Sequence, residues 1–138
     1  MLNRLEQRCR VVIVDDNPGI RAAMRILLTD DSGIEVIGEA ADGHEAIRAV
    51  GQLAPDVVLM DLSMPVMGGL EATAEIKRRY PGVRVVIVSM HKEPAFLVAI
   101  LEVGADGYVP KDASCSKLCA AIRSVMAGEI YGLRPDGC

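Results

Sequence analysis

The chain has 138 residues, a length that fits one domain with a buried core. Its residues are 51% hydrophobic and 25% charged, a composition that excludes a disordered protein. The net charge is −4 without a basic run, so these residues do not suit binding to a nucleic-acid backbone. The first ten residues contain no signal-peptide core and no hydrophobic run reaches membrane-spanning length, so we expect a cytoplasmic protein that does not associate with membranes.

Short β-branched runs alternate with helical patterns along the chain. Asn17-Pro18 has the form of a helix cap followed by proline at the first helical position. Five strand–helix units in a row predict an α/β fold, a single doubly wound five-stranded parallel sheet with helices on both faces. Strands are predicted at 10–15, 34–40, 56–61, 83–89 and 107–110, and helices from 18 to about 28 and at 43–53, 67–79, 94–103 and 114–126.

The composition of the strands predicts their places in the sheet. Residues 10–14, 57–60 and 85–88 are hydrophobic on both faces and should be central, whereas the second strand carries Glu35 and Glu39 and suits an edge. After Gly128 the chain is rich in glycine and proline. We therefore expect one folded domain over residues 9–127 and a tail, or the start of a linker, over 128–138.

Polar residues gather where the predicted strands end. Asp15 and Asp16 follow the first strand, Asp61 ends the third, Ser89 ends the fourth and Lys111 follows the fifth. In an open parallel sheet, ligands bind beyond the carboxyl ends of the strands, so these side chains should share one pocket. Three carboxylates repel one another unless cations lie among them, and one lysine is not enough. Mg²⁺ fits best, and a carboxylate, a metal, a hydroxyl and a lysine together are the parts of a phosphoryl-transfer site.

Each of these residues has an ordinary alternative explanation when it is taken alone. A pair of aspartates after a strand is commonly a turn or a helix cap, and a lone serine or lysine in a loop indicates nothing. Their joint placement at successive strand ends favours function. The cysteines are different: Cys115 and Cys119 lie four apart without a zinc pattern, so reduced thiols in a packed helix are favoured over a metal or redox site.

The motifs that hold these residues resemble the receiver domain of bacterial two-component response regulators. The resemblance covers about residues 9–127, and the run from Ser89 to the last helix is similar to the NarL/FixJ class in particular. It implies the flavodoxin-like strand order 2-1-3-4-5. The motifs that carry it are VVIVDD (11–16), LMDLSMPVMGG (59–69), VIVSM (86–90) and GADGYVPKD (104–112).

The resemblance assigns a role to each pocket residue. Asp61 would accept a phosphoryl group from a phosphohistidine of a sensor histidine kinase. Asp16 would bind Mg²⁺ directly, Asp15 through water or more weakly, and Ser63 through its backbone carbonyl. The acceptor Asp61 would also be a metal ligand.

The remaining roles concern the switch that follows phosphorylation. Lys111 would bind a phosphoryl oxygen, and Ser89 would turn toward the phosphate and donate a hydrogen bond. Tyr108 would move inward as Ser89 moves. Gly68-Gly69 stands where the family often has Asp-Gly, which should loosen the loop, and His91 is expected to be a solvated residue at the pocket rim rather than a general base.

The resemblance also implies partners. NarL/FixJ regulators usually continue into a helix-turn-helix domain, so DNA would be bound only through an effector domain absent from this chain, which we expect to be truncated rather than a single-domain regulator. Phosphorylation would promote a homodimer. The candidate surfaces are the face made by residues 94–110 and the first and last helices around Met24, Leu28, Leu118 and Ile122.

Three other functions were compared with this one. A haloacid-dehalogenase-like phosphatase, which would be an enzyme, needs a second aspartate where Ser63 stands. A flavodoxin-like cofactor binder needs a Ser-, Thr- and Gly-rich loop where the chain has acidic DDNPG. A receiver that signals without phosphate would not need all five pocket residues. We expect a signalling module rather than an enzyme with an external substrate.

Overall fold

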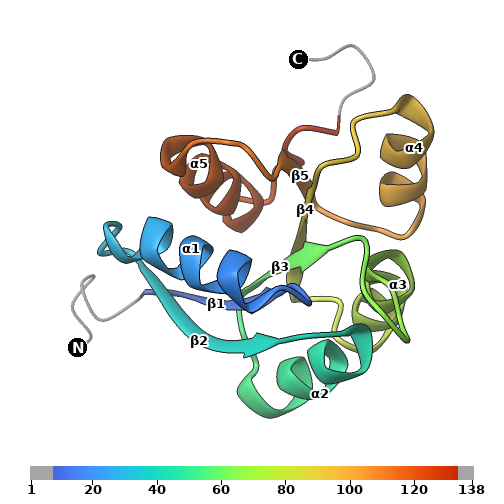
Figure 1. Ribbon diagram of the computed structural model, residues 1–138, viewed down its shortest axis with the longest axis horizontal. Helices are drawn as coiled ribbons and strands as arrows, with labels where there is room; N and C mark the ends of the chain where they lie inside the picture. Colours follow the sequence, from blue (N-terminus) through green and yellow to red (C-terminus); the bar gives the residue numbers. More distant parts are fainter. Residues whose placement is uncertain (1–7, 134–138) are drawn as a thin grey trace.

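The computed structural model describes residues 8–133 and confirms the predicted alternation of strands and helices (Figure 1). Differences from prediction are confined to the ends of elements. The strands are β1 Cys9–Val14, β2 Ile34–Ala40, β3 Val57–Asp61, β4 Arg84–Ser89 and β5 Gly107–Pro110. The helices are α1 Pro18–Thr29, α2 Gly43–Leu53, α3 Gly69–Arg79, α4 Pro94–Glu102 and α5 Cys115–Met126.

The five strands form one parallel sheet in the order β2-β1-β3-β4-β5, as expected. The register brings the ends of the strands level with one another. Asp61 lies opposite Val88, and Ser89 lies opposite Pro110. The residues that follow β1, β3, β4 and β5 therefore meet at one edge of the sheet.

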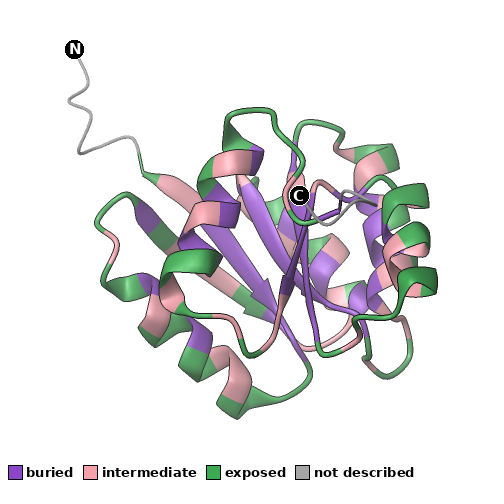
Figure 2. Cartoon of the chain, turned by 90° about the horizontal axis from the view of Figure 1, so that it is seen from above, coloured by how far each residue is buried: buried purple, intermediate pink, exposed green. Residues whose placement is uncertain are grey.

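The sheet separates two hydrophobic cores. Alternate residues of a strand point to opposite faces, so Val12 and Val58 pack under α2, α3 and α4, while Ile13 and Leu59 pack under α1 and α5. Figure 2 shows the buried strands enclosed by helices whose outer faces are exposed. Burying each such side chain contributes about 1.5–3 kcal/mol before the entropy of ordering the chain is subtracted.

Helix ends follow the local sequence signals. Asn17, Asp42 and Ser114 accept hydrogen bonds from the first turns of α1, α2 and α5. The predicted start of α3 at residue 67 was wrong, because residues 67 and 68 belong to the loop and the helix begins at Gly69. A glycine with φ +87° follows α4 at position 104.

Packing continues beyond α5. Tyr131 forms a parallel bridge with Gly107 at the outer edge of β5, and Leu133 is 2% exposed. The opposite edge is β2, where Glu35 and Glu39 are exposed as expected. The division of the chain at residue 127 stays a prediction, but the described fold includes contacts up to Leu133.

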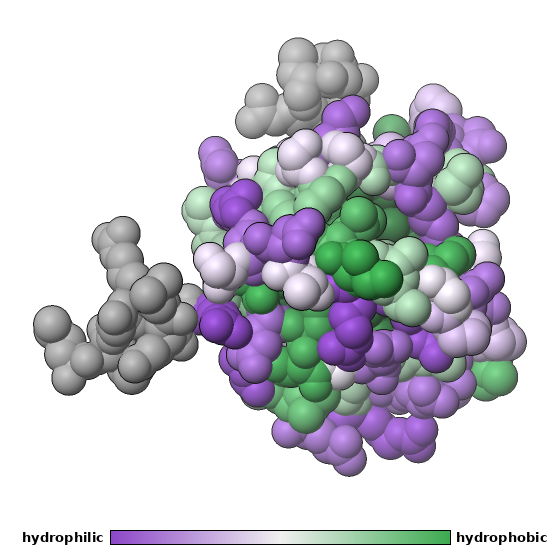
Figure 3. All heavy atoms as spheres, turned by 60° about the vertical axis from the view of Figure 1, so that its left-hand side comes forward, coloured by the Kyte–Doolittle hydropathy of each residue, from purple (hydrophilic) through white to green (hydrophobic). Residues whose placement is uncertain are grey.

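Over the described residues, no helix is long and hydrophobic enough to cross a membrane. Figure 3 brings forward the end of the sheet where the strands begin. Hydrophobic residues there gather in small groups separated by hydrophilic ones. This side of the molecule therefore presents no wide hydrophobic face.

Candidate functional site

The end of β1 supplies two carboxylates with different exposure. Asp15 is 1% exposed, and its Oδ1 accepts a hydrogen bond of 2.9 Å from the backbone N–H of Asn17. Its Oδ2 lies 3.0 Å from Nζ of Lys111. Asp16 is exposed. One carboxylate is thus fixed in the sheet edge, and the other remains free to meet a ligand from solvent.

Asp61 is the last residue of β3 and is 3% exposed. Its Oδ1 lies 3.1 Å from Nζ of Lys111, but its Oδ2 is buried without a hydrogen-bond partner. Burial raises the pKa of Asp61, and the hydrogen bond from Lys111 offsets only part of that rise, while the charge of Asp15 adds to it. A buried oxygen without a partner is costly in a folded protein, which marks Oδ2 as the atom that a ligand would meet.

Lys111 holds the two buried carboxylates together. Its backbone N–H donates to the carbonyl of Ser89 at 3.0 Å, which places its side chain over the end of β3. Burial alone would lower the pKa of Lys111, but its hydrogen bonds to Asp15 and Asp61 outweigh burial and leave that pKa raised. Lys111 therefore remains a cation in the pocket.

The three carboxylates fit a divalent metal ion. One oxygen from each of Asp15, Asp16 and Asp61 lies within 4.8 Å of the others, and this is the only group of three possible ligands among residues 8–133. Three carboxylates and one ammonium group leave two uncompensated negative charges. Hard oxygen ligands with this charge, together with the orphaned Oδ2 of Asp61, suit Mg²⁺.

The loop after Asp61 is held close to the sheet. Ser63 is exposed at its start, and at its end the N–H of Gly69 donates to the carbonyl of Leu62 at 3.0 Å. A Cβ on Gly69 would overlap the carbonyl oxygen of Asp61. The missing side chain of Gly69 permits this close approach, and the expectation that Gly68-Gly69 loosens the loop stays a prediction.

The tip of the same loop is strained. Val66 has φ +68°, a conformation that a β-branched residue rarely adopts, and its side chain is 83% exposed. The N–H of Met67 donates to the carbonyl of Pro65 at 2.8 Å, which closes a three-residue turn around Val66. The carbonyl of Met67 in turn accepts a hydrogen bond of 3.0 Å from the N–H of Gly43, which ties the loop to the start of α2.

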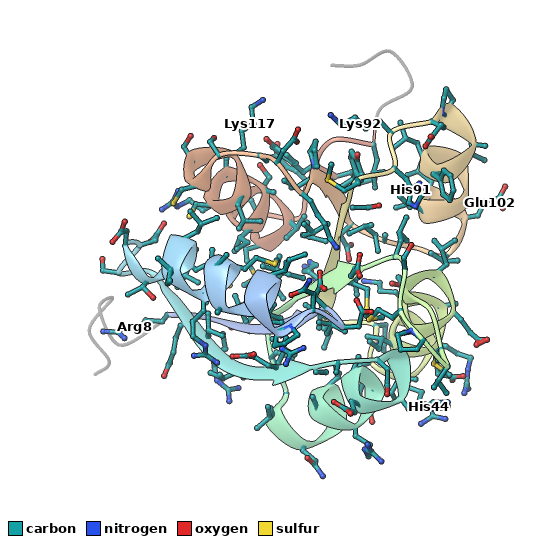
Figure 4. The ribbon with its side chains drawn as sticks, viewed as in Figure 1. Arg8, His44, His91, Lys92, Glu102 and Lys117 are labelled. Atoms are coloured by element: carbon teal, nitrogen blue, oxygen red, sulfur yellow. The ribbon has the colours of Figure 1, made fainter. Side chains whose placement is uncertain are left out.

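Ser89 and Tyr108 are joined through His91. Ser89 is buried, and its Oγ accepts a hydrogen bond of 3.0 Å from the N–H of His91. The hydroxyl of Tyr108, a residue that is 7% exposed, donates to the carbonyl of His91 at 2.8 Å. His91 lies beside α4 (Figure 4), and its imidazole stacks on Phe96 with ring centroids 4.4 Å apart. His91 thus packs against the start of α4, and its backbone connects the two predicted switch residues.

The structure corrects one expectation about surfaces. Four residues named for a dimer contact on the first and last helices are buried in the core: Met24, Leu28, Leu118 and Ile122 are 7%, 0%, 4% and 0% exposed. Their 3.6-residue spacing has the same form whether a helix faces its own sheet or a partner. On the alternative surface, α4 leaves Val98 54% and Leu101 36% exposed.

The thiols lie outside the candidate site. The Sγ of Cys115 donates to the carbonyl of Leu27 at 2.9 Å, which ties α5 to α1. Burial raises the pKa of Cys119 to about 11 and that of Cys9 to about 12, so neither is a reactive thiolate at neutral pH. These cysteines pack in the core below α1 and α5.

Sequence reasoning missed residues that position the site from outside it. Arg21 donates to the backbone carbonyl of Asp15 at 2.6 Å and pairs with Glu39 at 2.9 Å, so it fixes the strand end from α1. Gly43 lies against Met67, where a Cβ would come within 2.7 Å of a backbone oxygen. The position of Arg21, shortly after the acidic pair, was a sequence signal for its role. No sequence pattern indicates the contact of Gly43 with Met67.

The fold and this pocket define a class of α/β domain that carries a cluster of carboxylates and one lysine at the carboxyl end of a five-stranded parallel sheet. The chain belongs to the response regulator receiver domain family, whose sequence profile matches residues 11–123. The predicted family and fold are thereby confirmed.

The named relatives are bacterial response regulators. The chain is 42% identical over 122 residues to the response regulator GacA of Pseudomonas viridiflava, covering 88% of this chain and 57% of that protein. It is 42% identical over 121 residues to the response regulator UvrY of Escherichia coli, covering 88% and 56%. The chain thus spans a little over half the length of the curated relatives it matches.

Solved structures agree in fold. A two-component response regulator of the LuxR family from an Aurantimonas species superposes with a TM-score of 0.87 at 39% identity, covering 94% of this chain and 91% of that one. The receiver domain of a putative response regulator NarL from Mycobacterium tuberculosis gives a TM-score of 0.85 at 32% identity, covering 89% and 99%. These likenesses place the chain with receiver domains of LuxR-type regulators.

Proposed function

We propose that this domain accepts a phosphoryl group on Asp61 from a phosphohistidine of a sensor histidine kinase, in a reaction that needs Mg²⁺. The observation that carries the proposal is the Oδ2 of Asp61, a buried oxygen without a partner at the end of a central strand. Lys111 lies 3.1 Å from the other oxygen of the same carboxylate, where it neutralises negative charge.

The chemistry follows from the placement of these groups. An oxygen of Asp61 attacks the phosphorus, the phosphorus–nitrogen bond of the phosphohistidine breaks, and its electron pair stays on the imidazole. Lys111 holds Asp15 and Asp61 in place and offers its ammonium group to a phosphoryl oxygen. Asp15, Asp16 and Asp61, with the carbonyl of Ser63, would hold Mg²⁺, which supplies positive charge to the transferring group.

The proposed output is a change of conformation rather than turnover of an external substrate. Ser89 would move to the phosphoryl group and Tyr108 would respond through His91, to which both are hydrogen-bonded. Control of transcription would come from a DNA-binding domain outside these residues. This part of the proposal is supported by a similar structure, a DNA-binding response regulator of the LuxR family from Staphylococcus aureus.

Self-association on phosphorylation is part of the same proposal, as is a cytoplasmic location. The surface that supports a homodimer is α4, where Val98 and Leu101 are exposed and only Ile100 is fully buried. The first and last helices support it less, because their large hydrophobic residues named above serve the core. Gel filtration of the phosphorylated and unphosphorylated protein tests this point.

The decisive experiment is an intact-mass spectrum after incubation with acetyl phosphate. We expect a gain of one phosphoryl group with Mg²⁺, none with a chelator, and none in Asp61→Asn. Asp106→Asn, a matched change at the other end of the sheet, should leave the gain intact. No gain with acetyl phosphate or a histidine kinase would favour a receiver that signals without phosphate, and steady release of phosphate from phosphoesters would favour a phosphatase.

A further inference from the structure

An arginine outside the pocket holds the peptide group that joins Asp15 to Asp16. Nη1 of Arg21 donates a hydrogen bond of 2.6 Å to the backbone carbonyl of Asp15. Nε of the same side chain donates to Oε1 of Glu39 at 2.9 Å. Arg21 belongs to α1 and Glu39 to β2, and both elements pack against β1 (Figure 1). One guanidinium group therefore connects the edge strand to the main chain of the acidic pair.

The two aspartates of this pair are held in different ways. The carboxylate of Asp15 is buried and contacts both Lys111 and the N–H of Asn17. Asp16 is exposed. The carbonyl of Asp15 and the N–H of Asp16 belong to one planar peptide group, so a donor that fixes this carbonyl also fixes the plane from which Asp16 leaves. Arg21 is the side chain that supplies this donor.

The guanidinium group of Arg21 is itself held in place. Its side chain is 18% exposed, and Glu39 also pairs with Arg25, whose Nη2 lies 2.7 Å from the other carboxylate oxygen. The hydrogen bond from Arg25, and after it that from Arg21, lowers the pKa of Glu39, so Glu39 is ionised at neutral pH. The charge of Arg21 is thus partly offset by Glu39. What Arg21 contributes to the pocket is above all a hydrogen-bond donor at a fixed place.

We propose that Arg21 is a positioning residue for Mg²⁺: its hydrogen bond to the carbonyl of Asp15 keeps the carboxylate of Asp16 in reach of the ion. The inference rests on the proposed function, in which Asp16 is a metal ligand. An oxygen of Asp16 already lies within 4.8 Å of oxygens of Asp15 and Asp61. A ligand that is oriented beforehand loses less freedom when the ion binds, so binding is tighter.

A positioning donor and a nearby cation predict opposite effects. If Arg21 acted only through its charge, it would repel Mg²⁺, and its removal would strengthen Mg²⁺ binding. If Arg21 orients the peptide group before Asp16, its removal weakens Mg²⁺ binding. The direction of the change in affinity therefore distinguishes the two roles.

The test is a Mg²⁺ titration of the full chain without a phosphoryl donor, followed through the amide signals of residues near Asp61. We expect Arg21→Met to weaken Mg²⁺ binding about 10-fold, the size of effect that residues behind metal ligands commonly have. Arg25→Met is the matched control, because it removes an arginine from the same helix and the same partner, Glu39, and should bind Mg²⁺ like the wild type. Unchanged or tighter binding by Arg21→Met, or an equal loss in both variants, would overturn the inference.

A conservative variant keeps the test decisive if Arg21→Met fails to fold. Arg21→Lys retains the positive charge but loses the planar fork that reaches Asp15 and Glu39 together. Positioning predicts weaker Mg²⁺ binding in Arg21→Lys, with a smaller loss than in Arg21→Met. An affinity equal to that of the wild type would overturn the inference in favour of a role of charge alone.

Phosphorylation kinetics separate binding of the ion from the chemistry. With acetyl phosphate, Arg21→Met should need more Mg²⁺ than the wild type but reach the same rate at saturating Mg²⁺, because Asp61 and Lys111 are unchanged. A rate that stays low at saturating Mg²⁺ would overturn a role confined to the metal. A wild-type protein that binds Mg²⁺ but is never phosphorylated would sink the proposed function, and the titration would still decide the role of Arg21. A wild type that binds no Mg²⁺ would sink both.

Discussion

The two ends of the sheet carry charged residues in different ways. At the amino end, where the strands begin, Asp106 Oδ2 accepts from Nζ of Lys77 at 3.0 Å and from the N–H of Val85 at 2.8 Å. Asp56 accepts from the N–H of Arg10 at 2.9 Å. Each of these carboxylates is satisfied by its neighbours.

The carboxyl end is unbalanced by comparison. Asp15, Asp16 and Asp61 share Lys111, and one oxygen of Asp61 has no partner. The difference teaches that a carboxylate at the end of a strand is not in itself the mark of a functional site, since both ends of the sheet have them. What distinguishes a site is the excess charge that the protein does not compensate and that a ligand must.

The largest expected effect is on the rate of phosphorylation when the lysine at each end of the sheet is replaced. Lys111→Met removes the only cation that contacts both buried carboxylates, so phosphorylation by acetyl phosphate should slow about 100-fold. Lys77 is a lysine of similar exposure that pairs with Asp106 at the amino end, and Lys77→Met should leave that rate unchanged. Rates from intact mass at several donor concentrations decide the matter, and equal losses in the two variants would contradict the comparison.

The same substitution at the two ends should change stability in opposite directions. In a chelator, Asp61→Asn removes excess negative charge and should raise the free energy of unfolding by about 1–2 kcal/mol. Asp106→Asn leaves the Lys77 ammonium without its carboxylate partner and should lower it by about 1–3 kcal/mol. When urea unfolding is repeated with Mg²⁺, the stability advantage of Asp61→Asn over the wild type should become smaller. The destabilisation by Asp106→Asn should stay the same. Destabilisation by both would refute the asymmetry.

The pH dependence follows from the raised pKa of Asp61, whose cause is first of all burial. A group whose pKa is higher in the folded state favours folding below its ordinary value of 3.8, and that contribution is lost as the pH rises through the folded pKa. The stability advantage of Asp61→Asn should therefore vanish at acidic pH and grow toward neutrality. Urea unfolding of both proteins from acidic to neutral pH measures this advantage. An advantage independent of pH would disprove the raised pKa of Asp61 as its cause.

The smallest effect concerns two strained residues, one at each end. Val66 in the loop after β3 and Ala54 after α2 have φ of +68° and +48°. Replacing each by glycine should raise the free energy of unfolding by about 0.5–1 kcal/mol. Only Val66→Gly should also weaken Mg²⁺ binding, because it loosens the loop that carries Ser63. Thermal unfolding and a Mg²⁺ titration of Asp61-proximal amide signals check this, with Ala54→Gly as the control.

The sequence pattern was sufficient for the parallel sheet and for the convergence of Asp15, Asp61 and Lys111, because parallel strands bring their carboxyl ends to one edge. The full strand order came from the resemblance to the family. The sequence pattern could not show which helix faces are free, since Met24 and Leu28 have the same spacing in either case. Contacts between distant backbones, such as Gly43 against Met67, leave no local pattern either.

The packing of residues 129–133 after α5 was missed for a related reason. Gly132 lies in the glycine- and proline-rich stretch expected to be a tail or the start of a linker, and only the position of the Tyr108 carbonyl shows why glycine is required there. A single buried residue such as Leu133 also lacks the periodicity from which elements are recognised. Packing against a distant strand decided the conformation of this segment.

The packing of residues 129–133 against β5 has a practical consequence for anyone who shortens the domain. Cutting the chain after α5 would expose the carbonyl of Asp106 and the N–H of Tyr108 and empty the space filled by Leu133. Unpaired edges of this kind recruit other strands, so a fragment ending near residue 127 should be prone to self-association that has no relation to signalling. Versions made for crystallisation, screening or biosensor fusion should keep every residue up to Leu133.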